Sequence, residues 1–330
     1  MAFDDILGNS RAKRILKKAL QKDRMPNSLL FTGPEGVGKK EVALVLAKAI
    51  NCLQKKDDAC EVCSSCKAIN NRNFPDVMII SPEKNLIKIS QMREMKATAY
   101  LKPMVGRKRV FVLEGAEKMN DEAANSVLKI LEEPPAFTHI ILVSHNPYLI
   151  LPTIQSRCQK LSFSPILRED IEHELVARGE EQQRAKIISL LVKGNLKQAM
   201  SLDWEDVQTI RTAAWQLFGA LMRGDNLSSF LKNYAFARRD ALEEEFVKVL
   251  EILSSLCRDL LLVKEGGSLD LLLNPDFALE IQAMQNGISL GQIMDFLVKI
   301  DFALFALRRN LNVNLIVSAL FSSVIEPSHV

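Results

Sequence analysis

A glycine-rich segment near the start of this 330-residue chain limits its possible folds more than any other feature. Residues 33–40 read Gly-Pro-Glu-Gly-Val-Gly-Lys-Lys, directly after a short apolar run and directly before a helical pattern. The spacing G-x-x-x-x-G-K between a strand and a helix is typical of a loop whose backbone N–H groups hold phosphates at the helix N-terminus. The segment therefore predicts a phosphate-binding α/β domain, with a simple glycine turn as the alternative.

Apolar runs alternate with helical patterns throughout the first half of the chain. Continuous apolar runs suit strands that are buried on both faces of a parallel sheet. The alternation therefore predicts an α/β domain with a parallel sheet over residues 1–165. The predicted strands are 29–32, 77–80, 110–113, 140–143 and 159–164, and the predicted helices are Ser10–Gln21, Lys39–Asn51, Ser90–Leu101 and Asp121–Leu131.

After Pro165 almost every pattern is helical. We predict a small helical domain over residues 166–205 and a larger all-α domain over residues 206–330, with a junction at 203–206. The predicted helices are Arg168–Arg178, Glu181–Leu191, Leu196–Leu202, Asp206–Met222, Asp240–Val263, Leu290–Arg309 and a last one at Val313–Ile325.

Composition and charge narrow the class of protein. The chain is 48% hydrophobic and 25% charged, as in ordinary globular proteins, which excludes long disorder. No uncharged apolar stretch reaches the roughly 18 residues of a membrane helix, and the acidic N-terminal residues do not resemble a signal peptide. We therefore expect a soluble cytoplasmic protein with no membrane partner. Residues 1–165 carry 26 Lys and Arg against 17 Asp and Glu, so this half is the better candidate to meet anions.

The phosphate loop departs from its pattern at the last position. A working loop carries Ser or Thr there, because the hydroxyl ligates Mg²⁺, whereas this chain carries Lys40. Two unit charges about 4 Å apart repel by roughly 4 kcal/mol at an effective dielectric constant of 20, and Mg²⁺ is doubly charged. We therefore expect weak or absent binding of ATP or ADP, without Mg²⁺. The nucleotide-binding candidates are Gly33, Gly36, Gly38, Lys39 and Lys40.

The second acidic (Walker B) element is also incomplete. After the strand at 110–113, a working site places an Asp for Mg²⁺ and then a Glu that orients water. This chain has Glu114 followed by Gly115, and glycine can perform neither task. Glu117 is expected to face elsewhere. Two independent defects predict that hydrolysis is absent or very slow.

Four of the six cysteines lie within fifteen residues and form a candidate metal site. Cys52, Cys60, Cys63 and Cys66 supply enough thiolates for one tetrahedral zinc ion, in a module inserted at residues 52–66. A closed site with four thiolates is structural rather than catalytic. An iron–sulfur cluster and unliganded buried thiols are the alternatives.

Taken together, the motifs resemble the delta-prime family of bacterial DNA polymerase III clamp-loader subunits, which are AAA+ proteins. The resemblance covers most of residues 1–165, whereas residues 166–330 match by architecture only. It implies an AAA+ P-loop domain with a parallel sheet, then a small helical lid and an all-α collar domain for oligomerisation. The matching segments are 6–8, the Gly33–Lys39 loop, the four cysteines, 75–76, 116–119, 125–135 and 151–158.

The resemblance also implies roles for single residues. Ser156-Arg157-Cys158 is similar to the family's Ser-Arg-Cys motif, whose arginine completes the ATP site of a neighbouring subunit in a five-membered ring. A guanidinium that reaches a γ-phosphate stabilises transition-state charge and can act in trans. By chemistry alone, a surface ion pair is the alternative. Ser144 or His145 matches the sensor position, and Lys197 stands where active relatives carry Arg.

The resemblance predicts a subunit that does not hydrolyse ATP itself. It would supply Arg157 in trans, so that the ring loads the sliding clamp on primed DNA. The implied partners are the gamma/tau and delta subunits, the sliding clamp and primer–template DNA. The basic cluster Lys102, Arg107, Lys108 and Arg109 faces either DNA or solvent. An ATP-hydrolysing gamma/tau-like motor and a zinc-dependent nucleic-acid-binding protein are the alternative functions.

Overall fold

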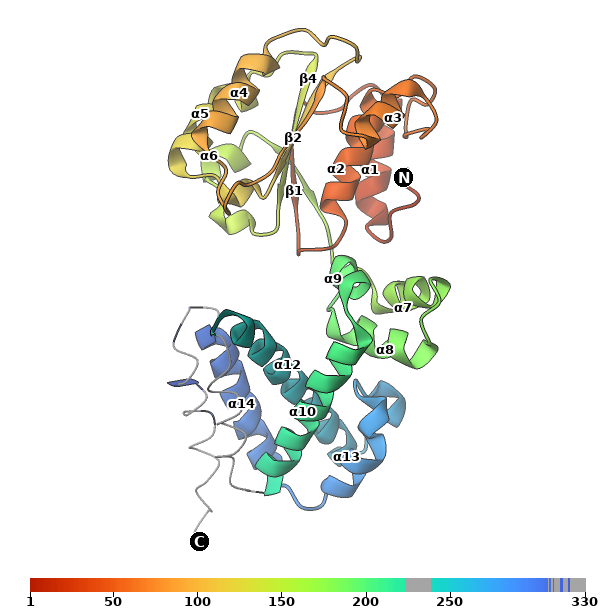
Figure 1. The fold of residues 1–330 in the computed structure, drawn as a ribbon, viewed down its shortest axis with the longest axis vertical. Coiled ribbons are helices and arrows are strands. Elements are labelled where there is room, and N and C mark those ends of the chain that lie inside the picture. The colour runs from red at the N-terminus through yellow and green to blue at the C-terminus, as the bar shows by residue number, and fades with distance from the viewer. Residues whose placement is uncertain (224–238, 308, 310, 312–314, 317–319, 321–330) are drawn as a thin grey trace. The chain divides into compact units, whose positions relative to one another are not determined.

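A computed structural model describes residues 1–223, 239–307, 309, 311, 315, 316 and 320. The described chain divides into two compact units (Figure 1). The first comprises Met1–Ala185 and Val192–Ser201, and the second comprises Lys186–Leu191 and the described residues from Leu202 onward. The predicted domain boundaries at residues 165 and 205 stay a prediction. Most of the helix predicted at Val313–Ile325 lies outside the described residues.

The first unit is built on a five-stranded parallel sheet in the order β2-β3-β4-β1-β5. Every paired strand is parallel to its neighbour, and β3 and β4 are buried along nearly their whole length. This burial explains their unbroken apolar character. The prediction of an α/β domain with a parallel sheet is confirmed. The strands are β1 (Ser28–Thr32), β2 (Val77–Ile80), β3 (Arg109–Glu114), β4 (Thr138–Ser144) and β5 (Gln159–Ser162).

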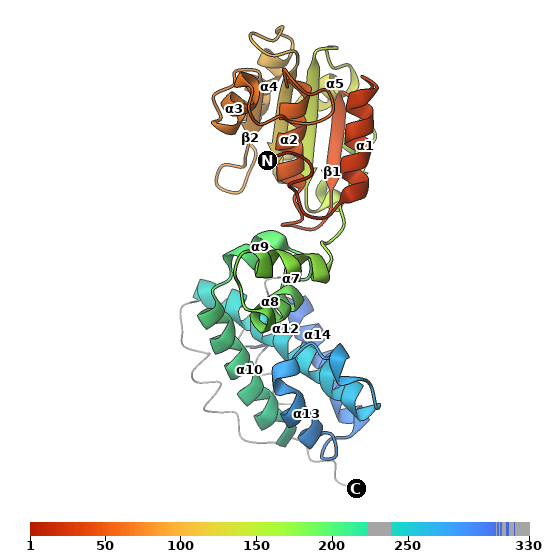
Figure 2. The same ribbon diagram turned by 90° about the vertical axis from the view of Figure 1, so that its right-hand side faces the viewer.

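Helices cover both faces of this sheet (Figure 1). Figure 2 looks onto the face covered by α1 (Ser10–Gln21), α2 (Lys39–Ile50) and α3 (Ser64–Asn70). The other face carries α4 (Ile89–Ala99), α5 (Asp121–Glu132) and the single turn α6 (Pro152–Gln155), whose apolar side chains share one core with the strands. Helix α5 begins sharply because the Asn120 side chain accepts the Ala123 N–H at 2.9 Å.

The remainder of the described chain is helical, as the sequence predicted. The first unit also contains α7, α9 and part of α8, while the second unit packs α10, α12, α13 and α14 around their own apolar core. The predicted junction at 203–206 overlaps the first turn of α10. The bounds are α7 (Arg168–Ala177), α8 (Gln182–Leu191), α9 (Leu196–Ser201), α10 (Trp204–Arg223), α12 (Arg239–Lys264), α13 (Ala278–Met284) and α14 (Leu290–Leu307).

Among the residues that the structure describes, no helix combines the length and the apolar character needed to cross a bilayer. 

Candidate nucleotide site and metal centre

The glycine-rich loop joins β1 to α2 and needs its glycines for its own path. The backbone φ angles of Gly33, Gly36 and Gly38 are 145°, 71° and 90°, a region that favours glycine. A Cβ atom on Gly33 would lie 2.2 Å from the Phe163 carbonyl oxygen, and one on Gly36 would lie 1.6 Å from Asn195 Oδ1. Gly33 therefore excludes any larger residue, and a larger residue at Gly36 would displace the Asn195 side chain.

Lys39 is buried and bonded within its own loop. Its Nζ donates to the Gly33 carbonyl at 2.6 Å and also to the Pro34 carbonyl. Burial lowers the pKa of Lys39, and the carboxylate of Glu117 partly opposes that shift. The ammonium that would contact a phosphate is thus held by the backbone of the loop.

Lys40 pairs with the acidic residue at the end of β3. Its Nζ lies 2.7 Å from Glu114 Oε1, and Ser81 Oγ donates to Glu114 Oε2 at 3.1 Å. In an active P-loop site, the hydroxyl of a Ser or Thr at the last position of the loop and an acid at the end of the strand together hold Mg²⁺. Here the side chains at these two positions bond directly to each other.

The loop opens into a cavity of about 930 Å³. Its charged lining residues comprise six Lys or Arg and seven Asp or Glu. The lining therefore carries no excess of positive charge that would attract a polyphosphate by itself. These residues are Lys13, Lys39, Lys40, Lys118, Arg178 and Lys197, and Asp4, Asp5, Glu35, Glu41, Glu114, Glu117 and Glu174.

Glu117 and His145 meet at the edge of this cavity. The Glu117 side chain is 2% exposed, and its Oε1 lies 2.6 Å from His145 Nδ1. The expectation that Glu117 faces elsewhere is wrong: Gly115, with a φ of 63°, leads into a 3₁₀ turn that brings Glu117 to the cavity. Of the two sensor candidates, His145 lines the cavity, whereas Ser144 is buried and its Oγ accepts the Asn146 N–H at 3.1 Å.

The start of α9 packs against the glycine-rich loop. The Lys197 backbone N–H donates to the Gly36 carbonyl at 3.4 Å, and the Lys197 residue lines the cavity. The Asn195 side chain accepts the Gln198 N–H at 2.9 Å and so caps α9 beside Gly36. Lys197, the residue that stands where active relatives carry Arg, therefore lies beside the glycine-rich loop.

Arg157 lies between α6 and β5, away from this cavity. Its guanidinium donates to Glu132 Oε2 and to the Thr153 carbonyl, and its side chain is 30% exposed. Because Gln159 pairs with Leu29 at the start of β1, Arg157 lies beyond the amino ends of the strands, whereas the loop follows their carboxyl ends. The four residues of β5 alone span about 13 Å. Arg157 and the loop therefore lie at opposite ends of the strands, Arg157 at the amino ends and the loop at the carboxyl ends.

The four clustered cysteines converge on one point. Their sulfur atoms all lie within 4.8 Å of one another, and Cys60 Sγ lies 4.0 Å from Cys66 Sγ. Four Zn–S bonds of 2.3 Å in a tetrahedron place sulfur atoms about 3.8 Å apart. Backbone N–H groups of Lys55, Cys63 and Cys66 donate to the sulfur atoms of Cys52, Cys60 and Cys63 at 3.3, 3.3 and 3.4 Å. The donor set and its spacing fit a metal ion.

Without a metal ion, the thiols of the cluster differ in their tendency to ionise. Burial raises the pKa of the Cys66 thiol to about 12. At Cys63, burial acts in the same direction, but backbone N–H groups outweigh it and hold the pKa at about 6. Backbone hydrogen bonds alone therefore do not favour four simultaneous thiolates, so a bound metal ion would supply the missing positive charge.

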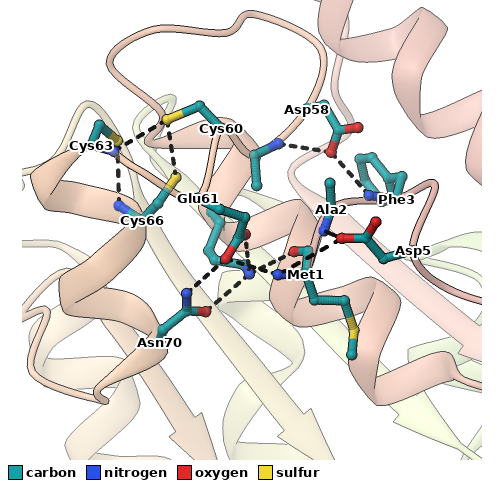
Figure 3. A network of polar contacts seen from close by, with 12 residues as sticks. Met1, Ala2, Phe3, Asp5, Asp58, Cys60, Glu61, Cys63, Cys66 and Asn70 are labelled. Carbon is teal, nitrogen blue, oxygen red and sulfur yellow. Dashed lines mark hydrogen bonds and ion pairs between the residues drawn. The ribbon is translucent and has the colours of Figure 1, made fainter.

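The cysteine module is attached to α2 and to the N-terminal segment (Figure 3). The buried Lys48 Nζ donates to Glu61 Oε1 at 2.5 Å, to Asn70 Oδ1 at 3.0 Å and to the Met1 carbonyl at 2.8 Å. On the other side of the module, Asp58 Oδ1 accepts the Phe3 N–H at 3.0 Å. These bonds fix the position of the module in the first unit.

A buried carboxylate fixes the loop before β3. Asp76 accepts the N–H groups of Met104, Val105 and Gly106 at 2.8–3.0 Å, and Arg109 Nη2 at 2.9 Å. Burial would raise the pKa of Asp76, but these donors outweigh it and lower the pKa. Arg109 is buried by this contact, so the prediction that it joins an exposed basic cluster is wrong. Lys102 and Arg107 are exposed and Lys108 is partly exposed.

The fold and site define a class of protein. A glycine-rich loop after the first strand of this parallel sheet, an acidic residue at the end of β3 and a helical region after β5 are features of an AAA+ P-loop domain. Residues 8–167 match the profile of the family described as "DNA polymerase III, delta subunit", so this part of the chain is similar to that family.

Similar proteins include subunits of bacterial DNA polymerase III. The chain is 33% identical over 196 residues to DNA polymerase III subunit delta' of Bacillus subtilis, a match that covers 59% of each protein. It is 30% identical over 207 residues to DNA polymerase III subunit tau of the same organism, which covers 61% of this chain and 37% of that one. A gamma subunit-related protein of Thermotoga maritima has a similar structure (TM-score 0.47, 17% identity, 95% and 98% coverage).

Proposed function

We propose that this chain is a clamp-loader subunit that does not hydrolyse ATP and that supplies Arg157 to the ATP site of a neighbouring subunit. The delta' and tau relatives, which are named as subunits of DNA polymerase III, support the class of complex. The proposed partners are gamma/tau and delta subunits, with the sliding clamp and primer–template DNA. The ring would load the clamp during replication.

The ion pair between Lys40 and Glu114 carries this proposal. The ammonium lies 2.7 Å from the carboxylate, so the two positions that would hold Mg²⁺ neutralise each other. Gly115 takes the place of the acid that orients the attacking water, and its φ of 63° disfavours a side chain there. Nucleotide binding at this loop is therefore proposed to be weak and independent of Mg²⁺.

The placement of Arg157 supports a role in trans. Arg157 and the glycine-rich loop lie at opposite edges of one sheet, so this arginine does not complete the site of its own chain. Its side chain is 30% exposed and so is accessible to another protein. An arginine that enters a neighbour's site would neutralise charge that develops on the γ-phosphate.

For the metal centre we propose a structural Zn²⁺ held by Cys52, Cys60, Cys63 and Cys66. A site with four thiolates leaves no open coordination position for catalysis, and thiolates select zinc or iron–sulfur clusters over hard cations. We also propose a lid at residues 166–205 and a collar at residues 206–330.

A turnover assay tests the proposed function. The purified chain alone should show no Mg²⁺-dependent ATP hydrolysis. In a complex reconstituted with ATP-hydrolysing partner subunits, Arg157→Ala should lower kcat by about a thousandfold, the lower end of the range for arginine fingers. Arg184→Ala is the matched control, because Arg184 is an exposed arginine that pairs with Glu181 at 3.3 Å. An unchanged rate for Arg157→Ala contradicts the proposal.

The 30% identity to a tau subunit favours one other candidate, an ATP-hydrolysing motor of the same loader. Rapid Mg²⁺-dependent hydrolysis by the chain alone would support that function instead. A third candidate, a zinc-dependent nucleic-acid-binding protein, predicts salt-dependent DNA binding by a chain that does not associate with loader subunits.

A further inference from the structure

Glu132 occupies a position where a helix disfavours negative charge. It is the last residue of α5, where unpaired carbonyl groups already carry partial negative charge. Its carboxylate instead pairs with Arg157 across 25 residues of sequence. We infer that Glu132 is the positioning residue for Arg157, an inference that rests on the proposed role of that arginine in trans.

The hydrogen bonds fix the guanidinium from one side. Glu132 Oε2 accepts Nε and Nη2 at 3.2 Å each, and the Thr153 carbonyl accepts Nη1 at 3.0 Å. Three of the five N–H donors are thereby engaged. Among the described residues, one N–H on each terminal nitrogen has no partner. Two donors on adjacent nitrogens suit two oxygens of a phosphate.

Both side chains project from one rigid base. Glu132 directly follows Leu131, and Arg157 directly precedes Cys158; both of these neighbours are buried in the core cluster that also contains Ile154 of α6. The backbone atoms that carry the pair therefore cannot shift independently of that core. Glu132 itself is 58% exposed, so its replacement removes an ion pair without opening a cavity.

The inference predicts a specific kinetic change. Without Glu132 the long arginine side chain is ordered only when it enters the neighbour's site. The loss of its conformational entropy then raises the free energy of the transition state. We expect Glu132→Ala to lower the kcat of the reconstituted complex about threefold to tenfold, the range set by ordering one long side chain. The KM for ATP should stay unchanged, because Glu132 does not contact the nucleotide.

The experiment compares variants in the reconstituted complex. Glu133→Ala is the matched control, because it removes the same charge from the same helix end, next to the pair. Glu132→Gln keeps an acceptor oxygen and should fall between wild type and Glu132→Ala. In an Arg157→Ala background, Glu132→Ala should cause no further loss, since Glu132 acts only through that arginine. Size-exclusion chromatography confirms that each complex assembles.

The outcomes separate this inference from the proposed function. If Arg157→Ala lowers turnover but Glu132→Ala behaves as Glu133→Ala does, the positioning role alone is overturned. The same holds if Glu132→Ala raises turnover, because the carboxylate would then restrain the arginine, or if it lowers turnover further in the Arg157→Ala background. If Arg157→Ala leaves turnover unchanged, both the proposed function and the positioning role are overturned.

Discussion

Replacement of Lys40 by threonine tests how the phosphate loop excludes a metal ion. A Mg²⁺ ion about 4 Å from the ammonium would be repelled by roughly 8 kcal/mol at an effective dielectric constant of 20, and by roughly 2 kcal/mol at 80. The Lys40 side chain is 40% exposed, so solvent screening favours the lower figure. About 2 kcal/mol corresponds to roughly 30-fold in affinity.

We therefore expect Lys40→Thr to bind ADP at least about 30-fold more tightly with Mg²⁺ than with EDTA, whereas the wild-type affinity should be the same in both. Threonine supplies the missing hydroxyl ligand, and Glu114 is released to meet the ion. ATP hydrolysis should remain absent, because Gly115 still cannot orient water. Isothermal titration calorimetry with ADP in each buffer measures the difference.

Lys118→Thr is the control for the loss of a cavity charge. Lys118 lines the same cavity but donates to Asn85 Oδ1 at 2.5 Å, away from the pair between Lys40 and Glu114. Its replacement should change ADP affinity equally in Mg²⁺ and in EDTA. A wild-type chain that already binds ADP tightly only with Mg²⁺, or a Lys40→Thr variant that does not respond to Mg²⁺, would refute the reasoning.

Two predictions concern stability. Removal of the metal by a chelator should cost at least about 3 kcal/mol and lower the Tm by roughly 6–12 °C, because metal binding is coupled to folding; unchanged thermal unfolding after verified metal loss contradicts a structural site. Asp76→Asn should destabilise the protein by about 3–5 kcal/mol in urea unfolding, because three N–H donors and Arg109 lose a charged acceptor. The pKa of Asp76 lies below its usual value of 3.8. The difference in unfolding free energy between wild type and Asp76→Asn should therefore have its full size above that pH and shrink as the pH falls through the lowered pKa. A constant difference down to pH 3 argues against this cause.

Elements with a strong periodic signal could be predicted from the sequence, whereas short ones could not. The helix predicted at Ser10–Gln21 has those bounds in the structure, and the strands agree within about two residues at each end. Helix α3 was missed because Ser64–Asn70 has no apolar repeat; it begins where Cys63 Sγ accepts the Cys66 N–H. Helix α6 was missed because it is a single turn that starts at Pro152.

The single residues of the candidate site were found by spacing, but their contacts were not. In the sequence, Lys40 and the Glu114-Gly115 element read as two independent defects, whereas Lys40 and Glu114 form one ion pair. Parallel strands bring their carboxyl ends to one edge of the sheet, so two anomalies of opposite charge at that edge were the available signal. The contact of Glu132 with Arg157 depends on how α5 packs against α6, which no local pattern records.

The opposite placement of Arg157 and the glycine-rich loop gives each chain a direction. If copies of this fold associate head to tail, every member offers an arginine on one side and presents a loop on the other. A member with an inactive loop still supplies its arginine to one neighbour, but the arginine of its other neighbour meets a site that does not hydrolyse ATP. A closed assembly that includes one such chain would then have one interface without ATP hydrolysis, and the position of every active interface would be defined relative to that one.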